Sequence, residues 1–309
     1  MTQFSPAAPT RDPLEAILLS GGGVLAVITG VDGPSYRPLG AMMAFLPDGT
    51  RAGTLSSGCI EADLAIHAQN ATAENATKTV LYGVGSPFVD IQLPCGGGLQ
   101  ITLIPRPDLS AINDIQTARS GRISTALALN AQTGTMSASD HAQTGWDGDV
   151  FNVHFPPQLK FLVFGKGPEA STFSGLVQSA GYPIVLLSQD DETLQFGHDI
   201  GVQTRHLTRP HIPADMTIDD QCAVILFFHD HDWEPQILKD ALTTPAFYIG
   251  SQGSQRARDN RLKTLLEMGV SKADLDRLFG PVGLIPSVRD PRTLAVSVLA
   301  EILKNAGAQ

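Results

Sequence analysis

Two of the three cysteines lie beside glycines in the N-terminal half of the chain, where a thiol could act on a ligand. Cys59 follows Gly58 at the apparent start of a helix, and a helix N-terminus favours the thiolate, which attacks electrophiles and binds soft metals. Cys95 is followed by three glycines, which leave backbone amides uncovered for a bulky ligand. We therefore predict two functional thiols, with a purely structural cysteine beside a turn glycine as the alternative.

Polar residues accompany both thiols. Ser57 precedes Cys59 in a run of small residues, and Glu61 adds a carboxylate two positions after it. Arg37 lies among two prolines and two glycines in residues 33–40, which form a stiff loop that presents a guanidinium. A guanidinium there pairs with a ligand carboxylate or phosphate, or it ties down the loop itself.

The C-terminal half contains a GxGxxA turn at residues 165–170, directly after the strand-like run 160–164. In a doubly wound sheet, such a turn lets the amides near Gly165 and Gly167 approach a pyrophosphate at a helix N-terminus. The next strand ends in Leu-Ser-Gln-Asp-Asp at residues 187–191, so the acid that holds a ribose is absent or displaced. The alternative is that these glycines only allow close packing.

A second turn of this kind, residues 250–256, reads Gly-Ser-Gln-Gly-Ser-Gln-Arg. Ser254 is a natural N-cap, and exposed N–H groups beside Arg256 would suit an anionic group. In the alternative, Ser254 only caps the helix and Arg256 is a solvated charge. His229 opens the sequence His-Asp-His-Asp at the end of another strand-like run, where it could orient a polar ligand or merely terminate the strand.

The composition limits the classes of function. A chain of 309 residues is long enough for two domains, and 42% hydrophobic against 17% charged residues indicates compact cores. The 21 Lys and Arg residues against 31 Asp and Glu residues give a net charge of −10, which disfavours nucleic acid and anionic membranes. Three cysteines without a CxxC pair, no signal-like N-terminus and no long apolar run predict a cytoplasmic protein.

The elements that must position these residues form an α/β protein of two domains. In residues 1–156, strand-like runs at 24–28, 41–45 and 99–104 flank a helical pattern at 59–68, so we predict an α+β domain. Residues 108–155 are polar and only weakly periodic, which is compatible with a stretch that is partly connector.

Residues 157–309 alternate strand-like runs with helical patterns, which is typical of a Rossmann-like parallel sheet. The strand-like runs are 160–164, 184–187, 223–228 and 246–249. A final helix is expected at 291–304, beginning with a proline and packing on the sheet.

Together these segments resemble the XdhC/CoxI family, accessory factors for the maturation of xanthine dehydrogenase and related molybdenum hydroxylases. The resemblance is carried by residues 33–42, 53–61, 93–97, 164–167, 228–231, 248–256, 280–284 and 291–301. It implies an N-terminal cofactor-handling domain followed by a Rossmann-like domain. Ser57 stands where the family usually has glycine, Ser188 where it has aspartate, and Arg292-Thr293 where an acid is common.

The resemblance implies an accessory protein without a catalytic residue, which binds molybdenum cofactor, protects it and delivers it to an apo molybdenum hydroxylase. Cys59 and Cys95 would contact the metal, and the cofactor would be molybdopterin or its dinucleotide. A cysteine desulfurase and a second copy of the chain are further candidate partners. The expected cofactor-binding residues are Arg37, Ser57, Gly58, Cys59, Glu61, Cys95, Gly96, Gly97, Gly165, Gly167, His229, Gly250, Gly253, Ser254 and Arg256. The alternative function is an NAD(P)-dependent oxidoreductase that uses the GxGxxA turn.

Overall fold

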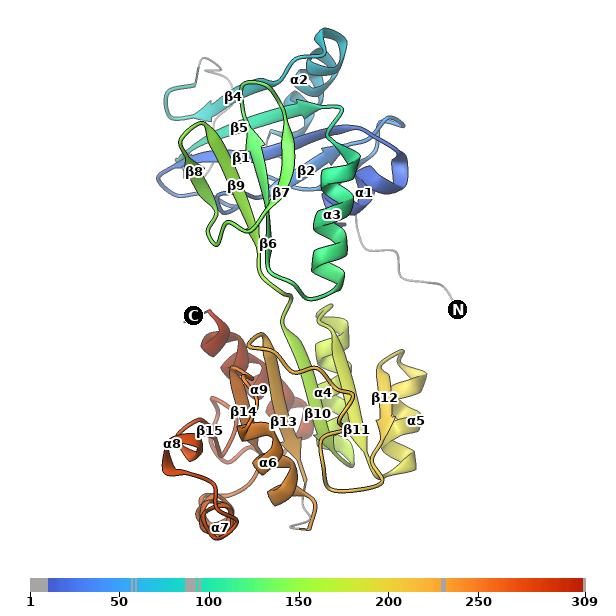
Figure 1. The fold of residues 1–309 in the computed structure, drawn as a ribbon, viewed down its shortest axis with the longest axis vertical. Helices are drawn as coiled ribbons and strands as arrows, with labels where there is room; N and C mark the ends of the chain where they lie inside the picture. The colour runs from blue at the N-terminus through green and yellow to red at the C-terminus, as the bar shows by residue number, and fades with distance from the viewer. Residues whose placement is uncertain are drawn as a thin grey trace. The chain divides into compact units, whose positions relative to one another are not determined.

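The computed structural model describes residues 11–56, 58, 60–86, 93, 96–228 and 232–307. The chain divides into two compact units, residues 1–157 and 158–309, which are shown in Figure 1 and are considered separately below. They are called the N-terminal and C-terminal domains.

The N-terminal domain is built on a five-stranded antiparallel sheet in the order β3-β2-β1-β5-β4. Its strands are β1 (Val24–Asp32), β2 (Met42–Phe45), β3 (Arg51–Gly53), β4 (Lys78–Gly83) and β5 (Gly98–Pro105). The three strand-like runs predicted from the sequence become β1, β2 and β5. Successive residues of β1 face opposite sides, so Val24, Ala26 and Ile28 join one core and Leu25 and Val27 join another.

Each face of this sheet is covered by a different layer. Helix α2 (Glu61–Glu74) packs on one face through Leu64, Ala68 and Ala71. The opposite face is covered by α1 (Pro13–Ser20), α3 (Leu109–Ser120) and a second sheet. The sheet that positions the cysteine loops is therefore buried on both sides.

Residues 108–155 are not a connector, so that prediction is wrong. They form α3 and a four-stranded antiparallel sheet in the order β7-β6-β9-β8. The strands are β6 (Thr125–Asn130), β7 (Met136–Ser139), β8 (Gly145–Asp147) and β9 (Val150–Phe155). The hydrophobic pattern is weak because the outer strands are short and largely exposed: in β7 only Met136 is buried.

The C-terminal domain contains a six-stranded parallel sheet in the order β12-β11-β10-β13-β14-β15, as expected of a Rossmann-like domain. Its strands are β10 (Lys160–Gly165), β11 (Ile184–Ser188), β12 (Gln203–His206), β13 (Cys222–Phe227), β14 (Tyr248–Ser251) and β15 (Leu278–Phe279). Its helices are α4 (Pro168–Ser179), α5 (Asp191–Asp199), α6 (Glu234–Leu242), α7 (Gln255–Glu267), α8 (Lys272–Leu275) and α9 (Pro291–Ala306).

Helices cover both faces of the parallel sheet. Phe173 of α4 and Val298 and Ile302 of α9 pack on one face, and Ile237 of α6 and Leu265 of α7 pack on the other. The predicted C-terminal helix is α9, which begins at Pro291 and packs as expected. Cys222 is buried at the start of β13.

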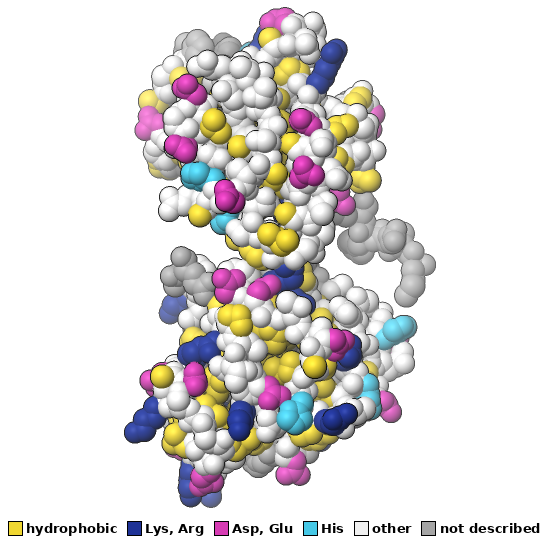
Figure 2. Space-filling view, viewed as in Figure 1, with side chains coloured by type: hydrophobic (Ala, Val, Ile, Leu, Met, Phe, Trp, Pro, Cys, Tyr) yellow, Lys and Arg dark blue, Asp and Glu magenta, His cyan; other side chains and the backbone are white. Residues whose placement is uncertain are grey.

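Two surface properties bear on function. None of the described helices is long and apolar enough to span a membrane. On the face shown in Figure 2, Lys and Arg side chains lie among acidic ones and form no continuous basic patch.

A substitution at Gly165 would test whether the GxGxxA turn must pack closely against the neighbouring strand β13. The φ of Gly165 is +155°, and an added Cβ would collide with the backbone carbonyl of Phe227 on the neighbouring strand. We expect Gly165→Ala to lower the free energy of unfolding by on the order of 2–4 kcal/mol, measured by urea denaturation. The control Gly181→Ala has φ +81° but nothing within 4 Å of the added Cβ, and should cost about 1–2 kcal/mol. Equal losses at both positions would contradict the packing role of Gly165.

Candidate functional site

Three loops of the N-terminal domain, residues 33–41, 54–60 and 84–97, have one end at the same end of the five-stranded sheet. The strand register shows this for two of them, because Asp32 at the end of β1 and Gly83 at the end of β4 both pair with Gly98 at the start of β5. Strand β3 ends farther back, since Gly53 pairs with Met43 and Met43 pairs with Ala26. Loop 54–60 still leads to this end, because it runs into α2, whose Asp63 accepts a hydrogen bond from Tyr82 next to Gly83.

These loops carry most of the residues predicted for the N-terminal site. Arg37, Gly58, Glu61, Gly96 and Gly97 are described, whereas the candidates Ser57, Cys59 and Cys95 lie outside the described residues. Among the described residues, no group of three His, Cys, Asp or Glu side chains could hold a metal ion. The geometry of the site is therefore established by the described residues that anchor its loops.

The carboxylate of Glu61 holds loop 54–60. Glu61 is the first residue of α2 and is only 4% exposed. Its Oε1 accepts hydrogen bonds from the Thr54 hydroxyl at 2.7 Å and from the amides of Leu55 and Ser56 at 3.2 and 2.9 Å. Its Oε2 accepts from the Ser56 hydroxyl at 2.6 Å and from the Ile60 amide at 3.2 Å. The carboxylate thus faces the described residues of loop 54–60 and anchors them to the start of α2.

The hydrogen bonds to Glu61 determine its ionisation. Burial by itself would raise the pKa of the carboxyl group, but donors from Ser56, Thr54 and the backbone lower that pKa from 4.5 to about 2. Because the protein itself supplies donors to both of its oxygens, Glu61 is ionised at neutral pH.

A second polar cluster joins the start of α2 to the end of β4. The hydroxyl of Tyr82, at the end of β4, donates to Asp63 Oδ2 at 2.5 Å, and His67 Nε2 lies 3.2 Å from the same oxygen. Burial, and then the bond to Asp63, raise the pKa of the Tyr82 hydroxyl. This contact fixes the start of loop 84–97 against the start of α2.

Glycines allow loops 33–41 and 84–97 to meet. A side chain at Gly97 would collide with the carbonyl oxygens of Asp32 and Pro34, and one at Gly83 would collide with the carbonyl of Gly97. Gly97 is buried at the contact between the two loops, so its lack of a side chain allows this contact. Gly96 is exposed, with nothing within 4 Å of an added Cβ. Gly96 and the similarly open Gly58 remain the glycines that could face a ligand.

Arg37 stands in the first of these loops. Its guanidinium lies 5.8 Å from the centre of the Tyr36 ring, and its Nε is buried without a hydrogen-bond acceptor among the described residues. A guanidinium with an unused donor is suited to pair with an anionic ligand group.

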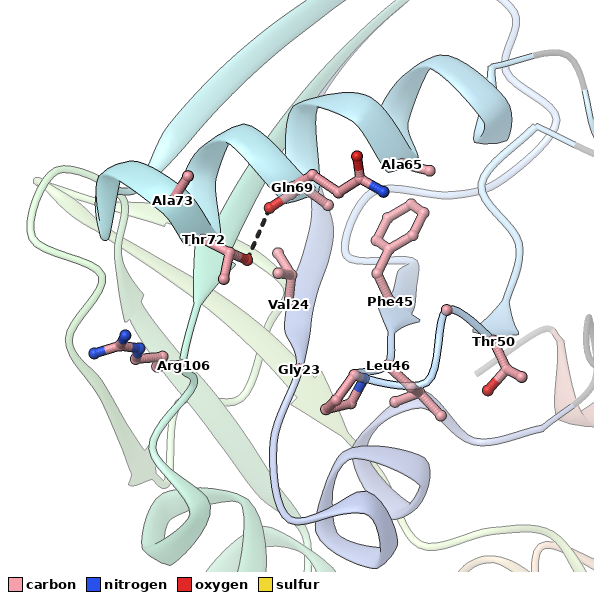
Figure 3. A pocket seen from close by; sticks show the side chains of 13 residues that line it. Gly23, Val24, Phe45, Leu46, Thr50, Ala65, Gln69, Thr72, Ala73 and Arg106 are labelled. Carbon is pink, nitrogen blue, oxygen red and sulfur yellow. Dashed lines mark hydrogen bonds between the residues drawn. The ribbon is translucent and has the colours of Figure 1, made fainter.

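A pocket of about 550 Å³ lies at the opposite end of the same sheet (Figure 3). It is bounded by α2, by Gly23 and Val24 at the start of β1, and by Phe45 at the end of β2. Apart from Arg106 its lining is mostly apolar, and none of the predicted site residues lines it. This pocket is thus separate from the cysteine loops.

The GxGxxA turn of the C-terminal domain uses its groups internally. The Gly167 amide donates to the Thr193 hydroxyl at 2.9 Å, and this hydroxyl donates to Asp190 at 2.6 Å. Asp190 caps α5, and its hydrogen bonds with Thr193 lower its pKa. Glu169 adds a carboxylate in the first turn of α4. The Gly167 amide is therefore bonded within the protein, and Gly165 packs against β13.

The second glycine-rich turn, residues 250–256, is more exposed than the GxGxxA turn. Ser254 caps α7 as predicted, accepting from the Ala257 amide at 3.2 Å, and Gly253 and Arg256 are exposed. Gly250 lies within β14, where an added Cβ would collide with Tyr248 and Val282, so the structure gives it a packing role. His229 lies outside the described residues.

Sequence reasoning missed the buried ion pair beside this turn. Arg261 Nη2 lies 2.8 Å from Glu234 Oε1, with side-chain exposures of 4% and 5%. The two residues belong to different helices and no sequence pattern links them, although an arginine on the inner face of α7 was an available signal.

Comparison with known proteins identifies the family. The model of the XdhC and CoxI family matches residues 20–83, and that of the XdhC Rossmann domain matches residues 161–302. The chain belongs to the XdhC/CoxI family.

Individual relatives match over nearly the whole chain. The molybdenum cofactor insertion chaperone PaoD of Escherichia coli is 32% identical over 297 residues, covering 94% of this chain and 86% of the relative. A probable xanthine dehydrogenase subunit of Bacillus subtilis is 25% identical, covering 91% and 92%. A crystal structure described as a xanthine dehydrogenase of Bacillus halodurans shares the fold, with a TM-score of 0.78, 22% identity and 96% coverage of both chains.

The anchoring role of Glu61 predicts a pH-dependent loss of stability. We expect Glu61→Gln to lower the free energy of unfolding at pH 7 by on the order of 2–3 kcal/mol. The side-chain NH2 group of glutamine cannot accept the hydrogen bonds that one carboxylate oxygen accepts from the loop. The folded-state pKa of about 2 lies below 4.5, so this contribution is present above pH 4.5 and is lost as the pH falls toward 2. Urea denaturation across this range measures it.

Glu74→Gln is the matched control on the same helix. The Glu74 carboxylate is 59% exposed in its ion pair with Lys78, so its replacement should change stability by less than about 0.5 kcal/mol. If the two variants lose equal stability at pH 7, Glu61 is not the anchor of the loop.

Proposed function

We propose that the protein is a molybdenum cofactor insertion chaperone that binds the cofactor, protects it and delivers it to an apo molybdenum hydroxylase. Membership of the XdhC/CoxI family and the similarity to PaoD support this function. The observation that carries it is that loops 33–41, 54–60 and 84–97 each have one end at the same end of the five-stranded sheet.

The chemistry of the cofactor suits the residues that these loops carry. Molybdopterin offers a metal bound by soft sulfur ligands, a flat pterin and an anionic phosphate. We assign Cys59 and Cys95 to the metal end, because thiolates are soft ligands. Gly58 and Gly96 provide open backbone for the pterin, and Arg37 can pair with the phosphate.

Glu61 and the Asp63–Tyr82 pair support the site without touching the cofactor in this proposal. Glu61 fixes the loop that precedes α2, and Asp63 joins α2 to the end of β4 through Tyr82. Pre-organised loops lose less entropy when they bind, which favours retention of a labile cargo.

The proposal also extends to partners. The recipient is an apo molybdenum hydroxylase, and a cysteine desulfurase would supply sulfur to the metal while the chaperone holds it. We include a dinucleotide form of the cofactor and a homodimer of the chain in this proposal. The oxidoreductase alternative has less support, because the amide of Gly167 is already bonded to Thr193.

The test is the metal and pterin content of protein purified anaerobically from a host that makes the cofactor. We expect Cys59→Ser and Cys95→Ser each to lower bound molybdenum by at least about tenfold and to lower pterin in parallel, because each removes a soft contact. The control Cys222→Ala changes a thiol buried in the C-terminal domain and should retain both. If both serine variants hold as much molybdenum as the parent, the assignment of the thiols fails.

A further inference from the structure

A pocket of about 780 Å³ in the C-terminal domain lies between the start of α7 and residues 281–289. We propose that it binds a phosphate monoester of a ring-bearing organic molecule, such as a nucleoside monophosphate. This inference rests on the geometry of the pocket and does not depend on the proposed function.

The turn before α7 directs backbone donors toward this pocket. The Gln252 carbonyl points to Arg261 Nη2 at 2.7 Å. Because N–H and C=O point in opposite directions across a trans peptide, the Gly253 amide points away from Arg261, and Gly253 itself lines the pocket. The amides of Gln255 and Arg256 lie in the first helical turn, where no intrahelical acceptor exists. Such donors at a helix N-terminus bind phosphate.

Arg261 provides a second and independent indication of an anion. Its side chain is 4% exposed, and its Nε and Nη1 are buried without an acceptor among the described residues. Its Nη2 would lie 3.3 Å from a Cβ added at Gly253, and its Nη1 would lie 3.5 Å from one added at Gly280. Arg261 does not line the pocket itself, but its guanidinium lies directly beside Gly253, which does. At that distance a buried cation with unused donors attracts an anion bound at the turn, because the local dielectric is low.

The charges around the pocket also favour a negatively charged ligand. Arg289 lines it, and none of the described lining residues is acidic, in a chain of net charge −10. Glu234 neutralises part of the Arg261 charge, but it does not line the pocket and is bonded to Arg261 and to the Ser251 hydroxyl. The pocket surface is thus positive or neutral.

The opposite wall is fixed and apolar. Glu301 of α9 accepts hydrogen bonds from the Gly283 amide and the Tyr248 hydroxyl, and the Ser297 hydroxyl accepts from the Ile285 amide at 2.8 Å. Leu284 and Ile285 are about half exposed on this wall, at 50% and 49%. A ring could pack on these side chains while its phosphate contacts the start of α7, which explains a pocket larger than inorganic phosphate requires.

The test is calorimetric titration of the full chain with AMP, CMP, inorganic phosphate and adenosine. We expect at least one nucleotide to bind more tightly than inorganic phosphate, and adenosine to bind at least about tenfold more weakly than AMP. Ser254→Asp keeps an N-cap but adds a negative charge at the phosphate position, and should weaken nucleotide binding by at least about tenfold. Ser254→Asn keeps the cap without the charge and should stay within about twofold of the parent.

Three outcomes would overturn the inference: no binding of any phosphate compound by the parent, equal binding of AMP and adenosine, or unchanged binding by Ser254→Asp. Thermal unfolding of both Ser254 variants confirms that the helix is intact. Cys59→Ser should lose molybdenum but keep nucleotide binding, so failure of the cofactor assignment is distinguishable from failure of this one.

Discussion

The buried carboxylate of Glu61 is the interaction on which the N-terminal site depends. Removing a carboxylate from water is costly unless hydrogen bonds replace its hydration. Here two hydroxyls and three backbone amides of residues 54–60 replace it, so the loop folds around the charge. Since the N-cap residue Ile60 makes no side-chain capping bond, the same carboxylate also takes over the role of a cap for α2.

The five-stranded sheet places the other loops of the N-terminal site next to the loop that Glu61 anchors. Antiparallel pairing places the end of β4 beside the start of β5, and Asp63 reaches Tyr82 from α2 across the same end. Gly97 then lets loop 84–97 approach the backbone of residues 32–34. These contacts position the loops, and Tyr82 also belongs to the core between the sheet and α2, so the loops are held by the same residues that close that core.

Sequence reasoning recovered the elements with strong hydrophobic patterns and failed where burial was partial. The strands around Val24 and Phe161 and the helix from Pro291 were predictable because their periodicity matches their packing. The sheet in residues 108–155 was not, since its outer strands are only three or four residues long and largely exposed, so they give no sustained apolar pattern. The direction of the Glu61 side chain and the pairing of Glu234 with Arg261 depend on tertiary contacts that no local pattern encodes.

Two similar glycine turns illustrate the same limit. The turn at Gly165 and Gly167 has the familiar spacing, yet the Gly167 amide is bonded within the protein, whereas the turn at Gly253 lines a pocket. The spacing of glycines indicates that the backbone is left uncovered by side chains. Only the structure shows whether this backbone packs against another strand or faces a pocket.

The most direct test of the central claim is the proximity of the two loop thiols. In a Cys222→Ala background, only Cys59 and Cys95 remain to react with dibromobimane, which becomes strongly fluorescent when it bridges two neighbouring thiols. The account predicts a fluorescent product in which peptide mapping finds Cys59 linked to Cys95 within one chain. Separate modification of each thiol, with no bridged peptide, would contradict it.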